Sequence, residues 1–465
     1  MNIPYIITCG GWIMAAIDKQ TLRFSNKDLV ALTIPVMLSS ILSIIAGMVD
    51  SAMVSSSGPA AVSAVSLVDA INILFITIFS GMASGGGVIM SQYIGHRDYK
   101  QAKATANQIV YITVAMALVV MTLLLCFQES VLRLVYGNLD ADVFENCKTY
   151  FFLTLFGYPF SAVGESSVYV LRSMGKNRQA ATCTISFNVV NVIGNAILIY
   201  GFGMGVAGAA IATTASRITY AIMGLRMAGN KKLLAHYENL LKFRLDWHII
   251  RRVVRIGSAS SLEYGLFYGG RILITSLIAT FGTIMITSNS VSQTLNNVGW
   301  VVVGALGTAS MPVIGQCIGA DEKEQAKYYM KKMTLAATVV TVVLFSGVYL
   351  LRYQLVRIYD FEPDVLDACA HYTGILALIS MGTVYSLAFN PVSGFRAAGD
   401  VRYATALAIG TMFAFRVALA YVLNAIFPSL GLMCVYIGMG VDWGVRAVCN
   451  LIRYRSGKWL YKKVI

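Results

Sequence analysis

Long apolar stretches recur along this chain, and each is long enough to cross a lipid bilayer as a helix. A span needs about 20 predominantly apolar residues. Twelve candidate stretches cover residues 28–54, 61–93, 104–127, 146–171, 179–200, 204–227, 250–279, 286–317, 329–352, 370–396, 403–426 and 431–451. Lipid offers no partner to free backbone groups, and the ten-residue alternating segments of a membrane barrel do not occur, so we predict an all-α membrane protein.

The composition agrees with a surface that faces lipid rather than water. Of the 465 residues, 57% are hydrophobic and only 12% are charged, whereas a soluble domain carries roughly 25% charged residues. The net charge of +14 would suggest nucleic acid in a soluble protein. Because no basic stripe with interleaved aromatic residues occurs, we expect no nucleic-acid partner.

Motifs for enzymes, metals and nucleotides do not occur in the sequence. The eight cysteines form no CxxC pair, which argues against a disulfide scaffold or a zinc site. The chain also lacks a P-loop, an HExxH motif, a nucleophile elbow and paired catalytic acids. We therefore predict that the protein is not an enzyme and holds no cofactor.

Lysine and arginine occur in alternate loops, and this pattern predicts the orientation. Residues 97–103, 172–178, 323–332 and 396–402 are rich in basic side chains, whereas residues 55–60, 201–203, 280–285 and 427–430 contain none. The positive-inside rule then places both termini and the basic connector 229–248 in the cytoplasm. We predict a multi-pass protein of the plasma (inner) membrane. We interpret residues 1–24 as an N-terminal lead-in, with a retained signal anchor as the alternative, because the apolar residues 3–16 lack the basic start of a signal peptide.

Two polar loop motifs recur at one spacing and indicate an internal duplication. Gln92-x-Ile94-Gly95 recurs as Gln316-x-Ile318-Gly319, and Arg172-x-x-Gly175-x-x-Arg178 recurs as Arg396-x-x-Gly399-x-x-Arg402, both 224 residues later. An even number of spans per copy keeps both copies in one orientation, so an axis near the membrane normal should relate them. We predict an N-lobe over residues 25–228, the connector 229–248, a C-lobe over residues 249–455 and a basic cytoplasmic tail over residues 456–465.

These motifs, in this order, resemble those of the multidrug and toxic compound extrusion (MATE) transporters. The matching pieces are Leu32-Thr33-Ile34-Pro35 with Asp50 fifteen residues later, the glycine-rich stretch ending at Gly95, Asn188-x-x-Asn191-x-x-x-Asn195 followed by residues 205–213, and residues 390–400. The resemblance covers roughly residues 25–455. It implies a V-shaped fold of twelve transmembrane helices in two pseudo-symmetric six-helix lobes.

The resemblance also implies a function and partners. Such proteins export organic, often cationic and amphipathic compounds, driven by inward flow of sodium ions or protons. We accordingly expect a cation-coupled antiporter that works by alternating access, with small organic substrates, a bilayer environment and a monomeric state.

Four polar residues are predicted to meet in the outer half of the N-lobe. Asp50 belongs to the first span, Asn191 and Asn195 share one face of the fifth, and Thr213 lies in the sixth. Carboxylate and amide oxygens suit sodium, whereas a carboxylate shielded from water suits proton coupling. The resemblance assigns these positions to the cation site, with Asp50 as the possible sodium or proton ligand. The alternative is that the asparagines only link helices.

This chain departs from the family pattern in two places. Several members carry a second aspartate where this chain has Asn195, and this change should weaken sodium binding or favour protons. Sodium-coupled members also carry acids on the seventh helix, one turn beyond Glu263 where this chain has Phe267, and on the tenth, where residues 373–398 contain none. A second ion site in the C-lobe is therefore doubtful.

Other polar residues within spans are assigned by the cost of burying charge. Glu263 should line the substrate cavity or pair with Arg271, and we assign Asn188 and Gln293 to the same cavity. Asp442 and Arg446 are spaced for a salt bridge on one helix face, and Arg416 should have a fixed partner. Asp69 and Glu165 are further cavity candidates, and Asp400 should cap a helix or gate the lobes.

A flippase for lipid-linked precursors is the second functional hypothesis. Such proteins have a similar fold but commonly need several inward-facing arginines for a pyrophosphate. We identify only Arg271 and Arg416 as basic residues in the middle of spans, so this hypothesis ranks below the exporter.

Overall fold

The computed structural model describes residues 22–137, 139–240, 242–359, 361–382 and 385–465, and over these residues the regular secondary structure is helical. The apolar segment 3–16 lies outside the described residues. The helices of the first half are α1 (Asn26–Ser55), α2 (Pro59–Gly95), α3 (Tyr99–Cys126), α4 (Gln128–Tyr136), α5 (Ala141–Leu155), α6 (Tyr158–Ser173), α7 (Asn177–Asn195), the π-helix η2 (Ala196–Gly201) and α8 (Gly205–Ala228). We use "N-lobe" for these elements.

The second half repeats this plan. Its helices are α9 (Trp247–Ala279), α10 (Thr283–Gly319), α11 (Lys323–Leu350), α12 (Arg352–Arg357), α13 (Pro363–Gly382), α14 (Tyr385–Ala397), α15 (Val401–Thr411), the π-helix η3 (Met412–Ala418), α16 (Leu419–Ile426), the short 3-10 helix η4 (Pro428–Leu430), α17 (Leu432–Ser456) and the 3-10 helix η5 (Lys458–Tyr461). We use "C-lobe" for these elements. Both lobes thus place a π-helical segment in their fifth spanning unit.

Nine helical segments of the described chain are long and apolar enough to cross a membrane: α1, α2, α3, α7 with η2, α10, α11, α13, α15 to α16, and α17. The pair α5–α6 and the helices α8 and α9 complete the twelve predicted spans. The exposed large side chains of α1, which include Ile34, Leu38 and Ile45, fit this setting. In water they would form an apolar patch, but in a bilayer they contact lipid.

The predicted span 146–171 is wrong as a single helix, because it breaks between α5 and α6. Pro159 occupies the first turn of α6, where a proline costs no helical hydrogen bond. Gly157 precedes it, and a Cβ there would collide with the side chain of Arg217. The break thus brings α6 and its neighbour α8 close together.

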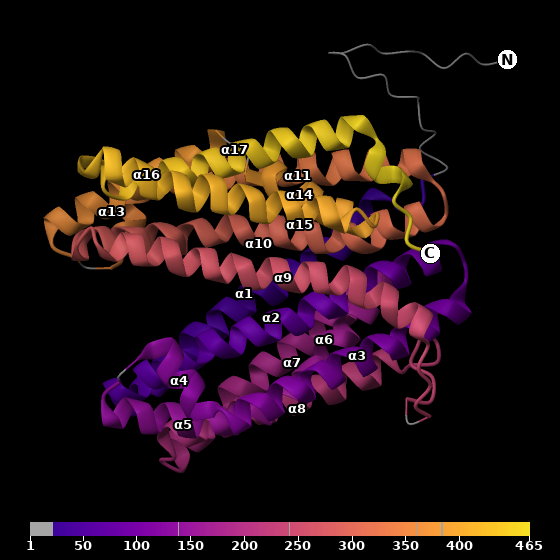
Figure 1. Ribbon diagram of the computed structural model, residues 1–465, viewed down its shortest axis with the longest axis horizontal. Helices are drawn as coiled ribbons and strands as arrows, with labels where there is room; N and C mark the ends of the chain where they lie inside the picture. The colour runs from indigo at the N-terminus through magenta and orange to yellow at the C-terminus, as the bar shows by residue number, and fades with distance from the viewer. Residues whose placement is uncertain (1–21, 138, 241, 360, 383–384) are drawn as a thin grey trace.

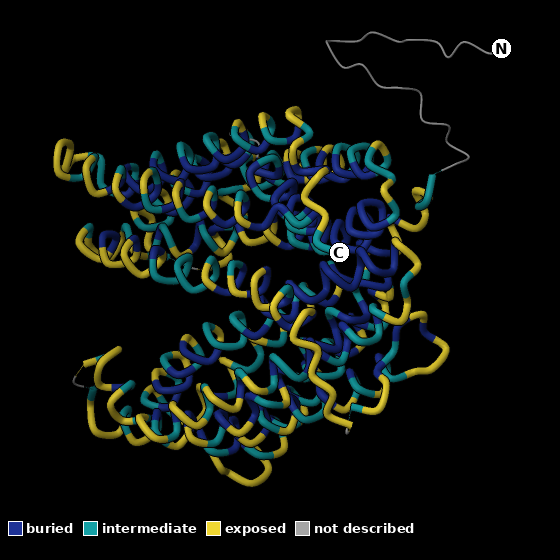
Figure 2. The backbone as a smooth tube through the Cα atoms, turned by 45° about the vertical axis from the view of Figure 1, so that its right-hand side comes forward, coloured by how far each residue is buried: buried dark blue, intermediate teal, exposed yellow. Residues whose placement is uncertain are grey.

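The two lobes diverge from one end of the molecule, as Figure 1 shows. We call the end where they meet the joined end and the other the splayed end; α1 begins and α17 finishes at the joined end. Contacts across the lobes are made chiefly by α2 with α9, α1 with α10, and α2 with α10. Figure 2 shows the backbone largely buried where the lobes meet.

Two glutamines close the joined end reciprocally. The side-chain amide of Gln92 donates to the carbonyl of Ala397 at 3.0 Å, and that of Gln316 donates to the carbonyl of Ser173 at 3.0 Å. Each pair of equivalent residues is separated by the 224 residues that separate the repeated motifs. The duplication read from the sequence is therefore also present in the contacts between lobes.

The C-terminal tail packs on the same joint. The backbone N–H of Val464 donates to Oε1 of Gln92 at 3.0 Å, and the backbone of Lys462 lies against Gly399, whose φ is +96°. Trp459 is fully buried. The predicted basic tail therefore covers the meeting line of the lobes.

Two glycines let α2 and α10 approach at this joint. A Cβ on Gly95 would overlap the backbone of Gln316, and a Cβ on Gly319 would overlap that of Gln92. We predict that Gly95→Ala destabilises the protein by about 1–3 kcal/mol, because neither backbone can move aside cheaply. The measurement is the unfolding temperature of purified protein. Gly304→Ala is the matched control, since open space surrounds Gly304 on α10; equal effects of the two substitutions would contradict the prediction.

Candidate functional site

Helices α1 and α7 run parallel in one register, and this register positions the candidate cation site. Three side-chain amides of α7 donate to α1. Asn177 donates to the carbonyl of Leu32 at 2.6 Å, Asn188 to the hydroxyl of Ser43 at 2.8 Å, and Asn195 to the carboxylate of Asp50. Each pair is 145 residues apart, so the same offset holds along the whole interface. This constant offset brings Asp50 and Asn195 together, as the sequence predicted.

The other two predicted site residues also meet. The amide of Asn191 donates to Oγ1 of Thr213 at 3.3 Å, which joins α7 to α8. Asn195 is fully buried, and its Oδ1 has no hydrogen-bond partner among the described residues. A buried acceptor without a partner is costly. Carboxylate, amide and hydroxyl oxygens are therefore available to a hard cation such as sodium.

A second polar network lies beside this site, and sequence reasoning found only one of its members. Asp69 of α2 accepts from Asn72 at 3.2 Å and from the hydroxyl of Tyr150 at 3.1 Å. Tyr158 donates to Oδ1 of Asn72 at 3.0 Å. Tyr150 lies within electrostatic reach of both Asp50 and Asp69, so the two networks are neighbours.

Arg217 belongs to this second network, and the sequence analysis did not identify it as a basic residue in the middle of a span. It is 4% exposed in the middle of α8 and donates to the carbonyl of Thr154 at 2.7 Å. The statement that only Arg271 and Arg416 are basic residues within spans is therefore wrong. The sequence contained the signal, an arginine inside the predicted span 204–227. Arg217 attracts Asp69, whereas no basic side chain of the described residues pairs with Asp50.

The N-lobe site adjoins a local change of helix type. The α-helical hydrogen bonds of α7 end at Asn195, and the π-helix η2 follows over Ala196–Gly201. π-helical turns are uncommon and occur frequently at functional sites. Asp50 lies five residues before the end of α1, and Thr213 eight residues after the start of α8, so both lie toward the splayed end.

Glu263 has a different partner from the one predicted. It forms an ion pair with Arg396 of α14 and accepts from Oγ1 of Thr405 at 3.2 Å. Pairing with Arg271 was wrong because Arg396 approaches from a neighbouring helix, which helical spacing cannot reveal. Glu165, another predicted cavity residue, accepts from the hydroxyl of Tyr220 at 3.1 Å.

Three ionised side chains form a buried cluster in the C-lobe, which we call the arginine cluster. Asp442 of α17 is fully buried and contacts Arg446 at 2.7 Å and Arg416 of η3 at 2.8 Å. The predicted Asp442–Arg446 bridge is confirmed, and Arg416 has its predicted fixed partner. The guanidinium of Arg416 also lies 5.9 Å from the ring centre of Phe267 and 5.6 Å from that of Trp443.

Asp400 neither caps a helix nor joins the lobes. It precedes α15, but its side chain makes no capping hydrogen bond. Instead it pairs with Arg453 of α17 at 2.7 Å. The predicted capping role is therefore wrong, and the carboxylate neutralises an arginine of its own lobe that lies 53 residues away in the sequence.

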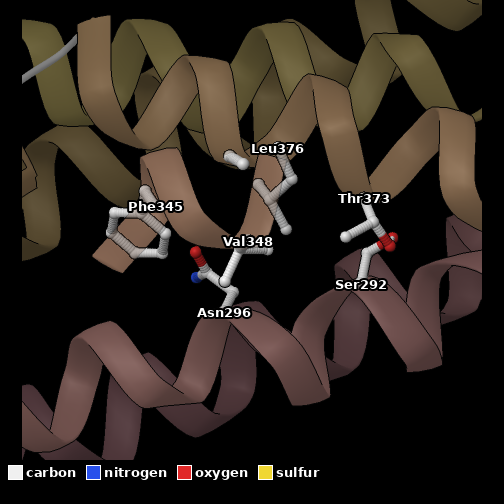
Figure 3. A pocket seen from close by; sticks show the side chains of 7 residues that line it. Ser292, Asn296, Phe345, Val348, Thr373 and Leu376 are labelled. Atoms are coloured by element: carbon white, nitrogen blue, oxygen red, sulfur yellow. Dashed lines mark hydrogen bonds between the residues drawn. The ribbon is translucent and has the colours of Figure 1, made fainter. Parts of the chain in front are cut away.

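Figure 3 shows a small pocket between α10, α11 and α13 in the C-lobe. Its lining includes Ser292, Asn296, Phe345, Val348, Thr373, Leu376 and Ala377. Ser292 and Thr373 bond each other at 3.1 Å, and Asn296 accepts from Ser380 at 3.0 Å. No charged residue lines the pocket, which suits a hydrogen-bonded helix contact better than an ion site. Gln293, predicted for the substrate cavity, donates instead to the sulfur of Met439 at 3.7 Å.

Known proteins resemble this chain over nearly its whole length. The family model described as MatE matches residues 35–197 and 259–422. The uncharacterized transporter YisQ of Bacillus subtilis is 26% identical over 450 residues, which cover 94% of this chain and 95% of YisQ. The probable multidrug resistance protein NorM of Thermotoga maritima is 22% identical and covers 97% of this chain and 96% of its own. A solved structure described as MATE in the bent conformation has a TM-score of 0.86 at 20% identity, covering 92% of this chain and 94% of that chain.

Proposed function

Because this chain belongs to the MatE family, the multidrug and toxic compound extrusion (MATE) transporters, we propose that it exports organic, cationic or amphipathic compounds in exchange for inward-moving sodium ions or protons. Membership makes it a multi-pass membrane transporter of a multidrug efflux family, and this supports transport rather than catalysis as its function. The observation that carries the coupling proposal is Asp50. It is a carboxylate without an ion-pair partner among the described residues, and it lies beside the unpartnered Oδ1 of Asn195.

The coupling step proposed here begins with a cation at Asp50. With the site empty, Asp50 accepts from Asn195 while it is repelled by Asp69. A bound cation would neutralise Asp50 and draw Asn195 Oδ1 toward it. Since both residues lie on the α1–α7 interface, the two occupancy states favour different arrangements of these helices. A ligand shifts a conformational equilibrium only through such unequal affinity.

Alternating access requires the joined end to open. The glutamine bonds between Gln92, Gln316 and the facing carbonyls support a state closed on that side. We propose that these bonds break when the lobes rock, which gives the second state of the cycle. The basic loops support a cytoplasmic location for the joined end and both termini. We further propose that the protein acts as a monomer in the plasma membrane.

Purified protein in proteoliposomes tests this function. Efflux of a cationic dye should follow an imposed sodium gradient, a proton gradient or both, when each is applied separately across the membrane. Dye movement that ignores both gradients would overturn the coupling proposal. Movement of a lipid-linked precursor instead of any dye would favour the flippase.

The choice between sodium and protons depends on Asn195, and its substitution gives a prediction. Asn195→Asp adds a second carboxylate directly beside Asp50. We expect the sodium concentration for half-maximal efflux to fall by roughly tenfold, because charged ligands contribute about 1.5–3 kcal/mol. The measurement is dye efflux against sodium concentration. Thr182→Asp, at an exposed residue thirteen positions away on α7, is the control and should leave this concentration unchanged; a response from both variants would contradict the prediction.

A further inference from the structure

The two lobes carry opposite excess charges at equivalent places. In the N-lobe, Arg217 accompanies two carboxylates, Asp50 and Asp69. In the C-lobe, Asp442 accompanies two guanidinium groups, those of Arg416 and Arg446. With all groups ionised, the first set has one negative charge in excess and the second has one positive charge in excess.

The fold places these sets in partly corresponding elements. Arg217 lies on α8, the counterpart of α17 with Asp442, whereas Asp50 and Asp69 lie on the counterparts of α9 and α10. The unit of α7 and η2 begins at Asn177 and that of α15 and η3 begins at Val401, which is the repeat offset of 224 residues. Asn195 directly precedes the π-helix η2, and Arg416 lies within the π-helix η3. The arginine cluster therefore occupies the C-lobe counterpart of the α7–α8 part of the candidate cation site.

Within the arginine cluster, the guanidinium of Arg446 has more hydrogen-bond partners than that of Arg416. Arg446 donates to Asp442 at 2.7 Å and to the carbonyl of Ala408 at 2.7 Å. Arg416 forms an ion pair with Oδ2 of Asp442, and its Nε is buried without a hydrogen-bond partner among the described residues. A guanidinium has five donors, and a buried charge is costly unless it is fully paired. The guanidinium of Arg416 thus has donor capacity left for a second anionic group.

The surroundings of Arg416 suit the anionic group of an organic molecule. Phe267 and Trp443 flank the guanidinium with aromatic rings, and arginine combines such stacking with bidentate binding of carboxylates. Arg271 lies one turn beyond Phe267 on α9 and is exposed. Because residues four apart share a helix face, Arg271 adds positive charge along the same side of α9.

We propose that Arg416 binds a monovalent anionic group, so that the C-lobe recognises an anion where the N-lobe recognises a cation. The anionic group is the carboxylate of an amphipathic compound or a free anion such as chloride. This inference rests on the proposed export function. It adds that the exported compounds include zwitterions, which carry an anionic group beside the cationic one.

A matched pair of dyes tests this site in proteoliposomes containing the full chain. One is a zwitterionic rhodamine with a free carboxylate, and the other is its methyl ester, a plain cation. Arg416→Gln leaves the neutral pair of Asp442 and Arg446 intact. We expect it to weaken transport of the carboxylate dye by roughly 10–100-fold, as for a lost charged hydrogen bond, with little change for the ester. Arg416→Lys should recover part of the loss, and Arg133→Gln, at an exposed arginine on α4, should affect neither dye.

Binding to purified protein separates the two sources of the anion and needs no transport. The unfolding temperature is measured in gluconate buffer with benzoate or chloride added at constant ionic strength. A rise with benzoate that disappears in Arg416→Gln supports a carboxylate of the compound, and the same result with chloride supports a free anion. Equal loss of both dyes, or no Arg416-dependent rise with either anion, overturns the proposal. Dye efflux that ignores both cation gradients would instead refute the proposed function and leave this binding result standing.

Discussion

Asp50→Asn is expected to reduce coupled efflux by at least 10–100-fold, which corresponds to the loss of about 1.5–3 kcal/mol of charged interaction. Asp50 is the one carboxylate in direct contact with the α7 asparagines among the described residues, and asparagine has nearly its size without its charge. The neutral amide cannot exchange a proton and binds sodium weakly. Dye efflux from proteoliposomes under each gradient measures the effect.

The fold of the Asp50→Asn variant should survive, and this makes the result interpretable. The substitution removes the repulsion between Asp50 and Asp69, so the unfolding temperature should not fall. Asp142→Asn, at an exposed carboxylate in the first turn of α5, is the control and should retain full efflux. Gradient-driven efflux by the Asp50→Asn protein at the normal rate would remove Asp50 from the mechanism.

The sequence predicted the architecture well because hydropathy and repetition act over long stretches. Twenty apolar residues must form a helix in lipid regardless of their order, and the repeat at Gln92 and Gln316 established two lobes before any contact was known. The break at Gly157 was missed because hydropathy does not register a local backbone change. Asp50, five residues before the end of α1, was still placed at the depth of Asn195, since depth follows from helix length.

Partners between distant helices were the part that sequence could not supply. Spacing within one helix found Asp442 and Arg446, which are four residues apart. It gave the wrong partner for Glu263, because Arg396 lies 133 residues away. The register of α1 against α7 could not be predicted either. Asn188, Asn191 and Asn195 indicated a polar face of α7, but not the residues of α1 that this face contacts. Pairing between helices depends on their packing, which the linear pattern does not encode.

Asp442→Asn is expected to cause the largest loss of stability of any single substitution considered for this protein. Asp442 is fully buried and is the carboxylate that contacts both Arg416 and Arg446. Removing its charge leaves two neighbouring guanidinium groups unpaired in the C-lobe, and breaking a buried ion pair in this way costs about 3–5 kcal/mol. The unfolding temperature of purified protein should fall accordingly, whereas Arg416→Gln should lower it far less.

A combined substitution tests whether this cost comes from unpaired charge. Replacing the whole arginine cluster, as Arg416→Met, Asp442→Leu and Arg446→Met together, removes every charge and keeps apolar volume, so most of the stability should return. A triple variant as unstable as Asp442→Asn would show that the hydrogen bond from Arg446 to the carbonyl of Ala408, rather than charge balance, holds η3 against α17. If the triple variant is stable, its arginines are not required for folding. A cluster dispensable for folding but needed for moving carboxylate compounds has a role in recognition, and this combination of results separates that role from a purely structural one.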